Sequence, residues 1–176
     1  MKKLILIVAA TTSLLTATPA AAGELFGGLT VHDVDTPLNK GGFENGLDVQ
    51  AGWRGGRIRA LKVVGAPSPY VFVSVSTDGG TNLAAAGISW KIGNKVYLRP
   101  GIGLAVHDRS SNVVGGGLRR DLGSRILFEP ELGLGVRLSD RLSVEASWIH
   151  VSNAGLLSRQ NPGMDNIGLR LNYRLR

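Results

Sequence analysis

The sequence predicts an all-β protein, an eight-stranded antiparallel β-barrel that crosses a membrane. Apolar and polar side chains alternate in repeated stretches of about ten residues, which is the length expected of tilted transmembrane strands. Helical periodicity is nearly absent, and the chain contains 25 glycines. Short turns between some stretches and longer connections between others fit the same architecture.

The chain begins with a predicted signal peptide. Lys2 and Lys3 precede the apolar run from Leu4 to Ala10, and three consecutive alanines end at Ala22. A basic start, a short apolar run and small residues at a cleavage point are typical of secretory signal peptides. We expect cleavage after Ala22, which leaves residues 23–176 as a single barrel domain of the bacterial outer membrane.

Composition excludes several classes of function. The chain has no cysteine, so neither a disulfide framework nor a thiolate metal site is expected. Without the signal peptide, 18 basic and 13 acidic residues remain, and in a secreted protein this excess fits an anionic lipid surface better than nucleic acid. The sequence holds no phosphate loop, no cluster of metal ligands and no nucleic-acid motif, so we expect no cofactor, no metal and no nucleic-acid partner.

Alternation assigns the two faces of the strands. From residue 128 to 138 the even positions are apolar, whereas the odd positions carry Glu129, Glu131, Arg137 and glycines. In a soluble sandwich the apolar face would be inside, and in a membrane barrel it faces lipid. Charged residues in mid-strand among many glycines favour a narrow, ion-paired barrel interior. We therefore expect a network inside the barrel from Glu129, Glu131, Arg137 and Glu145.

The eight predicted strands cover residues 24–33, 45–54, 69–77, 82–92, 95–107, 126–138, 141–152 and 165–175. The first and third are the least sharply bounded, since residues 57–64 fit a strand, a helix or a loop. Gly93-Asn94 and Ser139-Asp140 look like tight turns, and residues 108–125 look like a long loop. Residues 166–173 resemble the C-terminal signature that the outer-membrane insertion machinery reads, although the chain continues for three residues beyond it.

Three residues with catalytic potential share one face. In the seventh predicted strand the even positions from Leu142 to Trp148 are apolar, and His150 and Ser152 continue that row toward the lipid side. Asp165 has the same outward parity on the neighbouring strand, and Trp148 marks a membrane boundary. A serine hydroxyl becomes a nucleophile when an imidazole takes its proton and a carboxylate orients the imidazole. Positions i and i+2 of a strand lie about 6 to 7 Å apart, which lets the two side chains meet.

A simpler interpretation stays open on spacing alone. His-x-Ser is a weak motif, and His150 and Ser152 could cap a strand near a polar headgroup layer, with Asp165 opening the next strand. His32 and His107 lie outside the cluster, and we expect each to be a lumen or loop histidine.

The sequence around these residues favours a catalytic role. The segment from His150 to Leu156, with residues 161–165, closely resembles the active-site segment of the PagL-type lipid A 3-O-deacylases. Residues 105–108 and 122–125 are also similar to that family. The resemblance implies an eight-stranded outer-membrane barrel that hydrolyses the ester-linked acyl chain at position 3 of lipid A, without a cofactor, through a triad on its outer surface.

The resemblance also implies roles for individual residues. Ser152 would be the nucleophile, His150 the general base and then acid, and Asp165 the carboxylate that orients His150. The family's acid is typically glutamate, so an aspartate here must reach with one methylene less. Asn153 through its side-chain amide and Gly155 through its backbone N–H resemble the oxyanion-hole donors of the family.

Two alternatives to a lipid A esterase remain at this stage. One is a non-catalytic structural or adhesion barrel, in which His150 and Ser152 tolerate substitution. The other keeps the esterase and changes the substrate from lipid A, the lipid part of lipopolysaccharide, to a phospholipid or another acylated glycolipid. The sequence also leaves open whether the barrel is a monomer or a homodimer.

Overall fold

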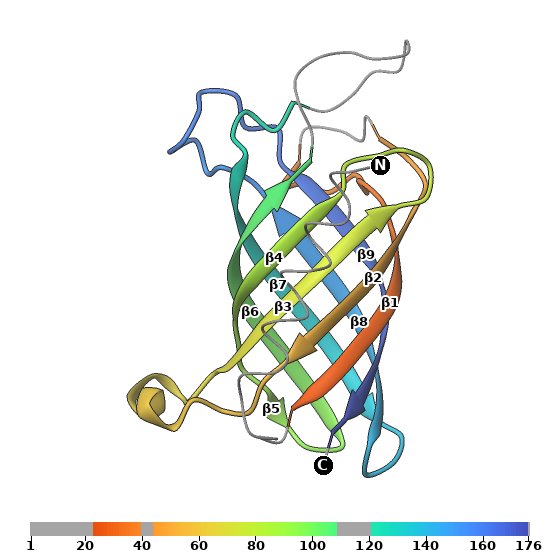
Figure 1. Cartoon of the computed structure of the whole chain (residues 1–176), viewed down its shortest axis with the longest axis vertical. Coiled ribbons are helices and arrows are strands. Elements are labelled where there is room, and N and C mark those ends of the chain that lie inside the picture. The colour runs from red at the N-terminus through yellow and green to blue at the C-terminus, as the bar shows by residue number, and fades with distance from the viewer. Residues whose placement is uncertain (1–22, 40–43, 109–120, 176) are drawn as a thin grey trace, which may run out of the picture.

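The computed structural model describes residues 23–39, 44–108 and 121–175, which form a closed barrel (Figure 1). The predicted signal peptide and most of the predicted loop 108–125 lie outside the described residues. The eight long strands are β1 (Glu24–Val31), β2 (Leu47–Arg54), β3 (Ser68–Ser76), β4 (Leu83–Ser89), β6 (Val96–His107), β7 (Ile126–Arg137), β8 (Leu142–Val151) and β9 (Met164–Arg174).

Every long strand is paired on both sides. The sheet runs in the order β4-β3-β2-β1-β9-β8-β7-β6, all neighbours are antiparallel, and β4 also pairs with β6. This last pairing closes the barrel, so none of the eight long strands described has a free edge, as a membrane-spanning sheet requires. The predicted eight-stranded antiparallel barrel is confirmed.

The predicted strand 82–92 is interrupted near its C-terminal end. β4 ends at Ser89. Trp90 donates its backbone N–H to Pro100 O, but proline has no N–H to return, and pairing with β6 resumes in the same register at the two-residue β5 (Ile92–Gly93). The ambiguous residues 57–64 contain a 3₁₀ helix, η1 (Arg59–Val64). Within the described part of the chain, no helix is long and apolar enough to span a membrane.

The outer wall of the barrel is apolar. On β9 the residues Ile167, Leu169 and Leu171 are 40 to 61% exposed, whereas the alternating Arg170 and Asn172 are each 1% exposed. The other long strands show similar alternation, which follows from the two-residue repeat of a strand. An apolar surface that surrounds a barrel is stable where it contacts lipid tails.

The interior is polar and ion-paired. Three buried arginines neutralise the acidic side chains: Arg170 Nη1 lies 2.7 Å from Glu131 Oε2, and Arg99 Nε lies 2.8 Å from Glu145 Oε2. The third, Arg54, contacts Glu24 and Glu131. Glu129 accepts a hydrogen bond from Tyr70. The expectation that Arg137 joins this network is wrong, because it lies at the barrel end and donates to Asn94 O.

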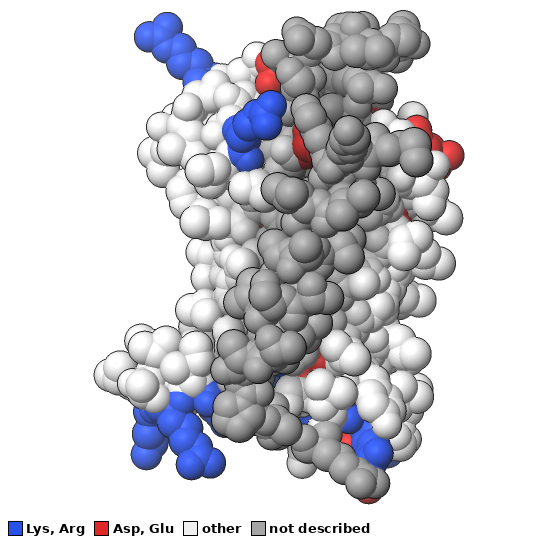
Figure 2. Space-filling model, viewed as in Figure 1, with Lys and Arg blue, Asp and Glu red and all other residues white. Residues whose placement is uncertain are grey.

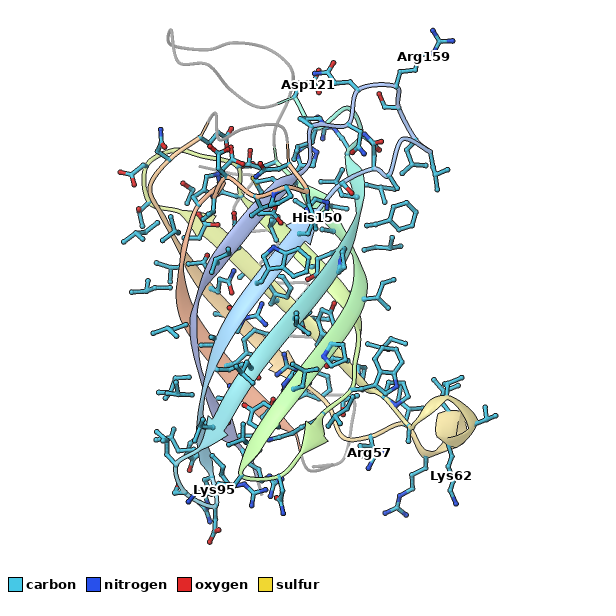
Figure 3. The ribbon with its side chains drawn as sticks, turned by 180° about the vertical axis from the view of Figure 1, so that it is seen from behind. Arg57, Lys62, Lys95, Asp121, His150 and Arg159 are labelled. Carbon is cyan, nitrogen blue, oxygen red and sulfur yellow. The ribbon has the colours of Figure 1, made fainter. Side chains whose placement is uncertain are left out.

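The two ends of the barrel differ. One end carries the tight turn at residues 138–141, and there Leu175 N donates to Gly23 O, so both ends of the described chain meet. The opposite end carries the long connections 32–46, 108–125 and 152–163. Outer-membrane barrels have short periplasmic turns and longer extracellular loops, so the long connections mark the extracellular end. His150 lies toward this end, and Lys95 at the other (Figure 3).

Candidate active site

The register of β8 and β9 brings His150 and Asp165 together. The two residues lie directly opposite each other in the antiparallel pair, and His150 Nδ1 is 3.0 Å from Asp165 Oδ1. An ionised carboxylate can only accept hydrogen bonds, so Nδ1 of the imidazole carries the hydrogen. The other ring nitrogen, Nε2, then keeps its lone pair and can accept a proton.

Two further donors hold the Asp165 carboxylate. Trp148 Nε1 donates to Oδ1 at 2.7 Å, and Thr36 Oγ1 donates to Oδ2 at 2.6 Å. Asp165 is fully buried, and a buried carboxylate is costly unless hydrogen-bonded donors satisfy it. The three donors therefore stabilise the ionised form and fix the plane of the carboxylate. Neither this role of Trp148 nor the contact of Thr36 was predicted from the sequence.

His150 and Asp165 occupy outward-facing positions that are nevertheless covered. The neighbouring Ile149 and Val151 face the interior and belong to the buried core, so His150 points outward by alternation. However, His150 is only 8% exposed. The Trp148 ring lies 6.2 Å from the His150 ring, and the segment that carries Thr36 packs over Asp165. The pair is thus shielded from solvent at the extracellular end of the wall.

Ser152 lies just beyond the last residue of β8. Its backbone makes two hydrogen bonds with Phe128 of β7: Ser152 N donates to Phe128 O at 3.1 Å, and Phe128 N donates to Ser152 O at 2.7 Å. The side chain is half-buried and two residues from His150. Among the described residues, neither Ser152 Oγ nor His150 Nε2 has a hydrogen-bond partner. Such contacts are often long in substrate-free sites and tighten only when substrate binds.

Asn153 organises the loop that follows Ser152. The side chain is fully buried, and its amide donates to Leu122 O at 2.9 Å and to Gln160 O at 2.6 Å. Its Oδ1 accepts the backbone N–H of Gly155 at 2.8 Å. Both predicted oxyanion donors are therefore engaged within the loop in this structure, and they tie it to the segment before β7.

Gly163 packs directly against the histidine. Its φ is +68°, a left-handed conformation that favours glycine. A Cβ at this position would lie 2.9 Å from His150 Cε1 and 3.2 Å from Leu38 O. A side chain at this position would therefore press on the imidazole.

The other two histidines have different surroundings. Nδ1 and Nε2 of His32 each lie 2.8 Å from a carboxylate oxygen, of Asp48 and of Glu44 respectively. Burial disfavours the charged ring, but hydrogen bonds to Asp48 and Glu44 outweigh it and raise the pKa of His32 to about 9. His107 Nε2 contacts Ser124 O at 2.8 Å. Among the described residues, neither histidine hydrogen-bonds His150, Ser152 or Asp165.

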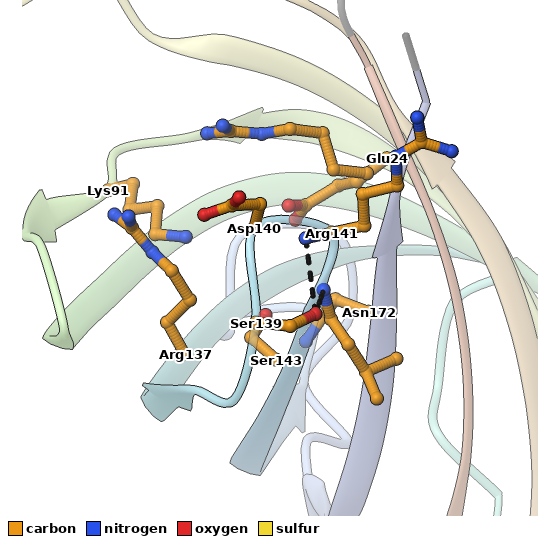
Figure 4. Close-up of a pocket in the computed structure, with 10 residues that line it drawn as sticks. Glu24, Lys91, Arg137, Ser139, Asp140, Arg141, Ser143 and Asn172 are labelled. Atoms are coloured by element: carbon orange, nitrogen blue, oxygen red, sulfur yellow. Dashed lines mark hydrogen bonds between the residues drawn. The ribbon is translucent and has the colours of Figure 1, made fainter.

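A polar hollow at the periplasmic end is remote from His150. Figure 4 shows its charged lining, which includes Lys91, Arg137, Asp140 and Arg141. Ser139 at its rim accepts the backbone N–H groups of Arg141 and Leu142, as expected of a tight turn. In the described ranges, no group of three or more His, Cys, Asp or Glu side chains could hold a metal ion.

An apolar outer wall, an ion-paired interior and a buried histidine–carboxylate pair at the extracellular end together define an outer-membrane barrel with a candidate hydrolytic site. A family model described as lipid A 3-O-deacylase (PagL) matches residues 37–174, and the chain belongs to this family. The family and the fold imply the bacterial outer membrane. The match includes all of β2 to β9 and every candidate site residue except Thr36, which lies one residue before it.

One solved structure shows the same fold. The crystal structure of the outer membrane enzyme PagL matches with a TM-score of 0.61 at 16% identity, and the match covers 86% of this chain and 99% of that one. The outer membrane protein Ail of Yersinia pestis matches with a TM-score of 0.49 at 15% identity, over 88% of this chain and 99% of that one. The curated proteins contain no match to the sequence.

Proposed function

We propose that this protein is a serine esterase that hydrolyses the ester-linked 3-O-acyl chain of lipid A. The observation that carries the proposal is the His150–Asp165 hydrogen bond on outward-facing positions, two residues from Ser152. Membership of the lipid A 3-O-deacylase family supports the choice of substrate. The lipid stays in the membrane, with its acyl chains along the apolar wall and its ester at the extracellular end.

In the first half of the reaction, Ser152 Oγ attacks the ester carbonyl carbon while His150 Nε2 accepts the hydroxyl proton. Asp165 remains ionised and stabilises the imidazolium through Nδ1. The tetrahedral intermediate then collapses, the bond from the carbonyl carbon to the sugar oxygen breaks, and His150 returns the proton to that oxygen. The products are an acylated Ser152 and a lipid with a free 3-hydroxyl group.

In the second half, water replaces the sugar. His150 Nε2 accepts a proton from a water molecule, whose oxygen attacks the carbonyl carbon of the acylated Ser152. The second tetrahedral intermediate breaks the bond to Ser152 Oγ, and His150 returns the proton to that oxygen. The fatty acid leaves, and the serine, histidine and aspartate regain their starting states.

Asn153 and Gly155 are the proposed donors to the oxyanion. Because the Gly155 N–H is bonded to Asn153 Oδ1 in this structure, substrate binding must turn the loop so that these donors face the carbonyl oxygen. The left-handed backbone at Gly155, with φ +68° and open space where a Cβ would lie, allows such a rotation. Loss of one oxyanion-hole donor typically lowers the rate of an enzyme about a hundredfold or more.

Thr36 and Trp148 act as positioning residues in this proposal. They touch Asp165 rather than the substrate, and each donates a hydrogen bond to a different carboxylate oxygen. Since an aspartate has one methylene less than the glutamate typical of the family, its reach toward His150 depends on how its carboxylate is held. The two donors hold it in the plane that also receives His150 Nδ1.

The test uses purified protein in detergent micelles with lipid A and, separately, a diacyl phospholipid as substrates. Fatty acids released by the parent, Ser152→Ala and Ser158→Ala proteins are measured by mass spectrometry. Ser158 is a half-buried serine of the same loop and serves as the matched control. We expect release from lipid A by the parent and Ser158→Ala only. Release from the phospholipid alone would point to another lipid, and no release from either would favour a structural barrel.

A further inference from the structure

The connection between β2 and β3 departs from the pattern of the barrel end on which it lies. This end otherwise carries short turns, but residues 55–67 form a 13-residue connection that contains η1. In Figure 1 this segment, coloured yellow, projects sideways beyond the strands instead of continuing along the barrel axis. Its position beside the wall places it where the periplasmic leaflet meets water.

Hydrogen bonds hold the segment in one shape. The Arg57 guanidinium donates to Ala66 O at 3.1 Å and to Gly65 O at 2.8 Å, which closes the connection at its base. Trp90, which follows β4, donates its indole N–H to Val64 O at 2.8 Å. The projection therefore has a defined shape and is anchored to the next hairpin. Tryptophan, which forms this anchor, is typical of the membrane–water boundary.

The segment exposes both apolar and basic side chains. Val63 is 93% exposed and Val64 is 54% exposed, which is unusual for valines in contact with water. Arg57, Arg59 and Lys62 are the only charged residues between positions 55 and 67, so the segment carries three positive charges and no negative one.

The basic side chains gather on one side. Figure 2 shows blue atoms along the lower edge of the projection and uncharged atoms above them, toward the level of the strands. In Figure 3 the labelled Lys62 points away from the barrel wall toward the periplasmic side, and Arg57 lies at the base of the segment. An amphipathic segment of this kind, with an apolar side toward the membrane and a basic side toward water, is typical of interfacial anchors.

We infer that residues 55–67 bind the periplasmic leaflet of the membrane, with Val63 and Val64 inserted among the acyl chains and Arg59 and Lys62 on the phosphates of anionic phospholipids. Arg57 closes the segment and keeps the two sides apart. Charge and position identify the binding partner as an anionic lipid surface. The segment carries three cations and two exposed valines, and it lies level with the end of the apolar wall, where an anionic membrane meets water. This inference is independent of any catalytic activity.

Site-directed spin labelling tests insertion directly, since the chain has no cysteine of its own. Single-cysteine variants Val63→Cys and Lys62→Cys are labelled and folded into vesicles of phosphatidylcholine with phosphatidylglycerol. Ala86→Cys, on the outer wall, gives a lipid reference, and Asp78→Cys, in an exposed extracellular turn, gives a water reference. We expect the label at 63 to collide more with oxygen than with an aqueous nickel chelate, and the label at 62 to show the reverse. Equal access of the chelate to both labels would overturn insertion.

A second measurement tests the choice of lipid. The oxygen-to-chelate ratio at position 63 is compared between vesicles with phosphatidylglycerol and vesicles of phosphatidylcholine alone, in the Val63→Cys protein and in the same protein with Arg59→Gln and Lys62→Gln. We expect a ratio severalfold higher with the anionic lipid in the first protein and no lipid dependence in the second. A ratio that is the same in both vesicle types for the first protein would overturn the role of anionic headgroups.

Discussion

Thr36 donates a 2.6 Å hydrogen bond to Asp165 across 129 residues of sequence. The threonine lies in the connection that follows β1, and the aspartate lies near the start of β9, the strand that pairs with β1. Closure of the barrel between its first and last strands therefore completes the hydrogen bonding of the candidate catalytic carboxylate. Folding of the barrel and assembly of the site are coupled at this contact.

Replacement of Thr36 by valine tests the positioning role. Valine keeps the branched shape but lacks the hydroxyl, so one oxygen of Asp165 loses its donor. We expect kcat for lipid A hydrolysis to fall about tenfold with little change in KM, since Thr36 does not touch the substrate. Thr36→Ser restores the donor and most of the rate. Equal kcat for the valine variant and the parent protein would show that the hydroxyl does not position Asp165.

Trp148→Phe removes the second donor. Phenylalanine retains an aromatic ring beside His150 but has no N–H for Asp165 Oδ1. We expect a loss in kcat of about tenfold, because a hydrogen bond to a charged group is removed. Trp53→Phe, on the outer wall of β2, is the matched control and should retain the rate of the parent protein. Steady-state kinetics on micellar lipid A measures kcat of both variants. An equal loss of kcat in Trp53→Phe would show that the effect comes from lost tryptophan packing and not from the hydrogen bond to Asp165.

Gly163→Ala should displace the imidazole of His150. The added Cβ would lie 2.9 Å from the ring, closer than real contacts allow, and the left-handed backbone adds strain. Gly79→Ala carries a similar positive φ of +73° with open space around the new methyl group, so it controls for backbone strain alone. We expect Gly163→Ala to lose most of its lipid A hydrolysis activity, whereas its folded fraction stays close to that of Gly79→Ala. Full activity in Gly163→Ala would contradict the packing against His150.

The His32 cluster predicts a pH dependence of stability. Because the pKa of His32 is raised from 6.5 to about 9 by Asp48 and Glu44, the folded state binds its proton more tightly than the unfolded state. The stabilisation is fully present below pH 6.5 and disappears as the pH rises through about 9. It amounts to about 3 kcal/mol at most. Thermal unfolding in detergent should show a midpoint that falls between pH 7 and 10 in the parent protein and much less in His32→Gln. Identical pH profiles of the two proteins would rule out the charged histidine.

The fold was predictable because the strands of a membrane barrel alternate apolar and polar side chains with a two-residue repeat. Alternation from Phe128 to Leu138 assigned the lipid face, and the opposing glutamates assigned the interior. The differences from the prediction occurred where alternation gives no information. Arg137 lies at the last position of β7, and Pro100 on β6 has no N–H to return to Trp90, which interrupts the strand. A periodic signal says nothing about the position at which a strand stops.

The candidate site was predictable where its residues follow one another in sequence. His150 and Ser152 stand two apart on one strand, and Asp165 follows after a single loop. Thr36 was not predictable, since its contact with Asp165 depends on closure between β1 and β9. Gly163 was not distinguishable from a turn glycine, because the atom that excludes a side chain belongs to His150, thirteen residues earlier in the chain.

The most direct measurement is the mass spectrum of lipid A from an outer-membrane-bearing bacterium that expresses either this protein or its Ser152→Ala variant, with both proteins shown to reach the membrane. We expect loss of one ester-linked hydroxyacyl mass with the parent protein and none with the variant. Unmodified lipid A in both cultures, or the same loss in both, would contradict the assignment of Ser152 as the nucleophile of a lipid A deacylase.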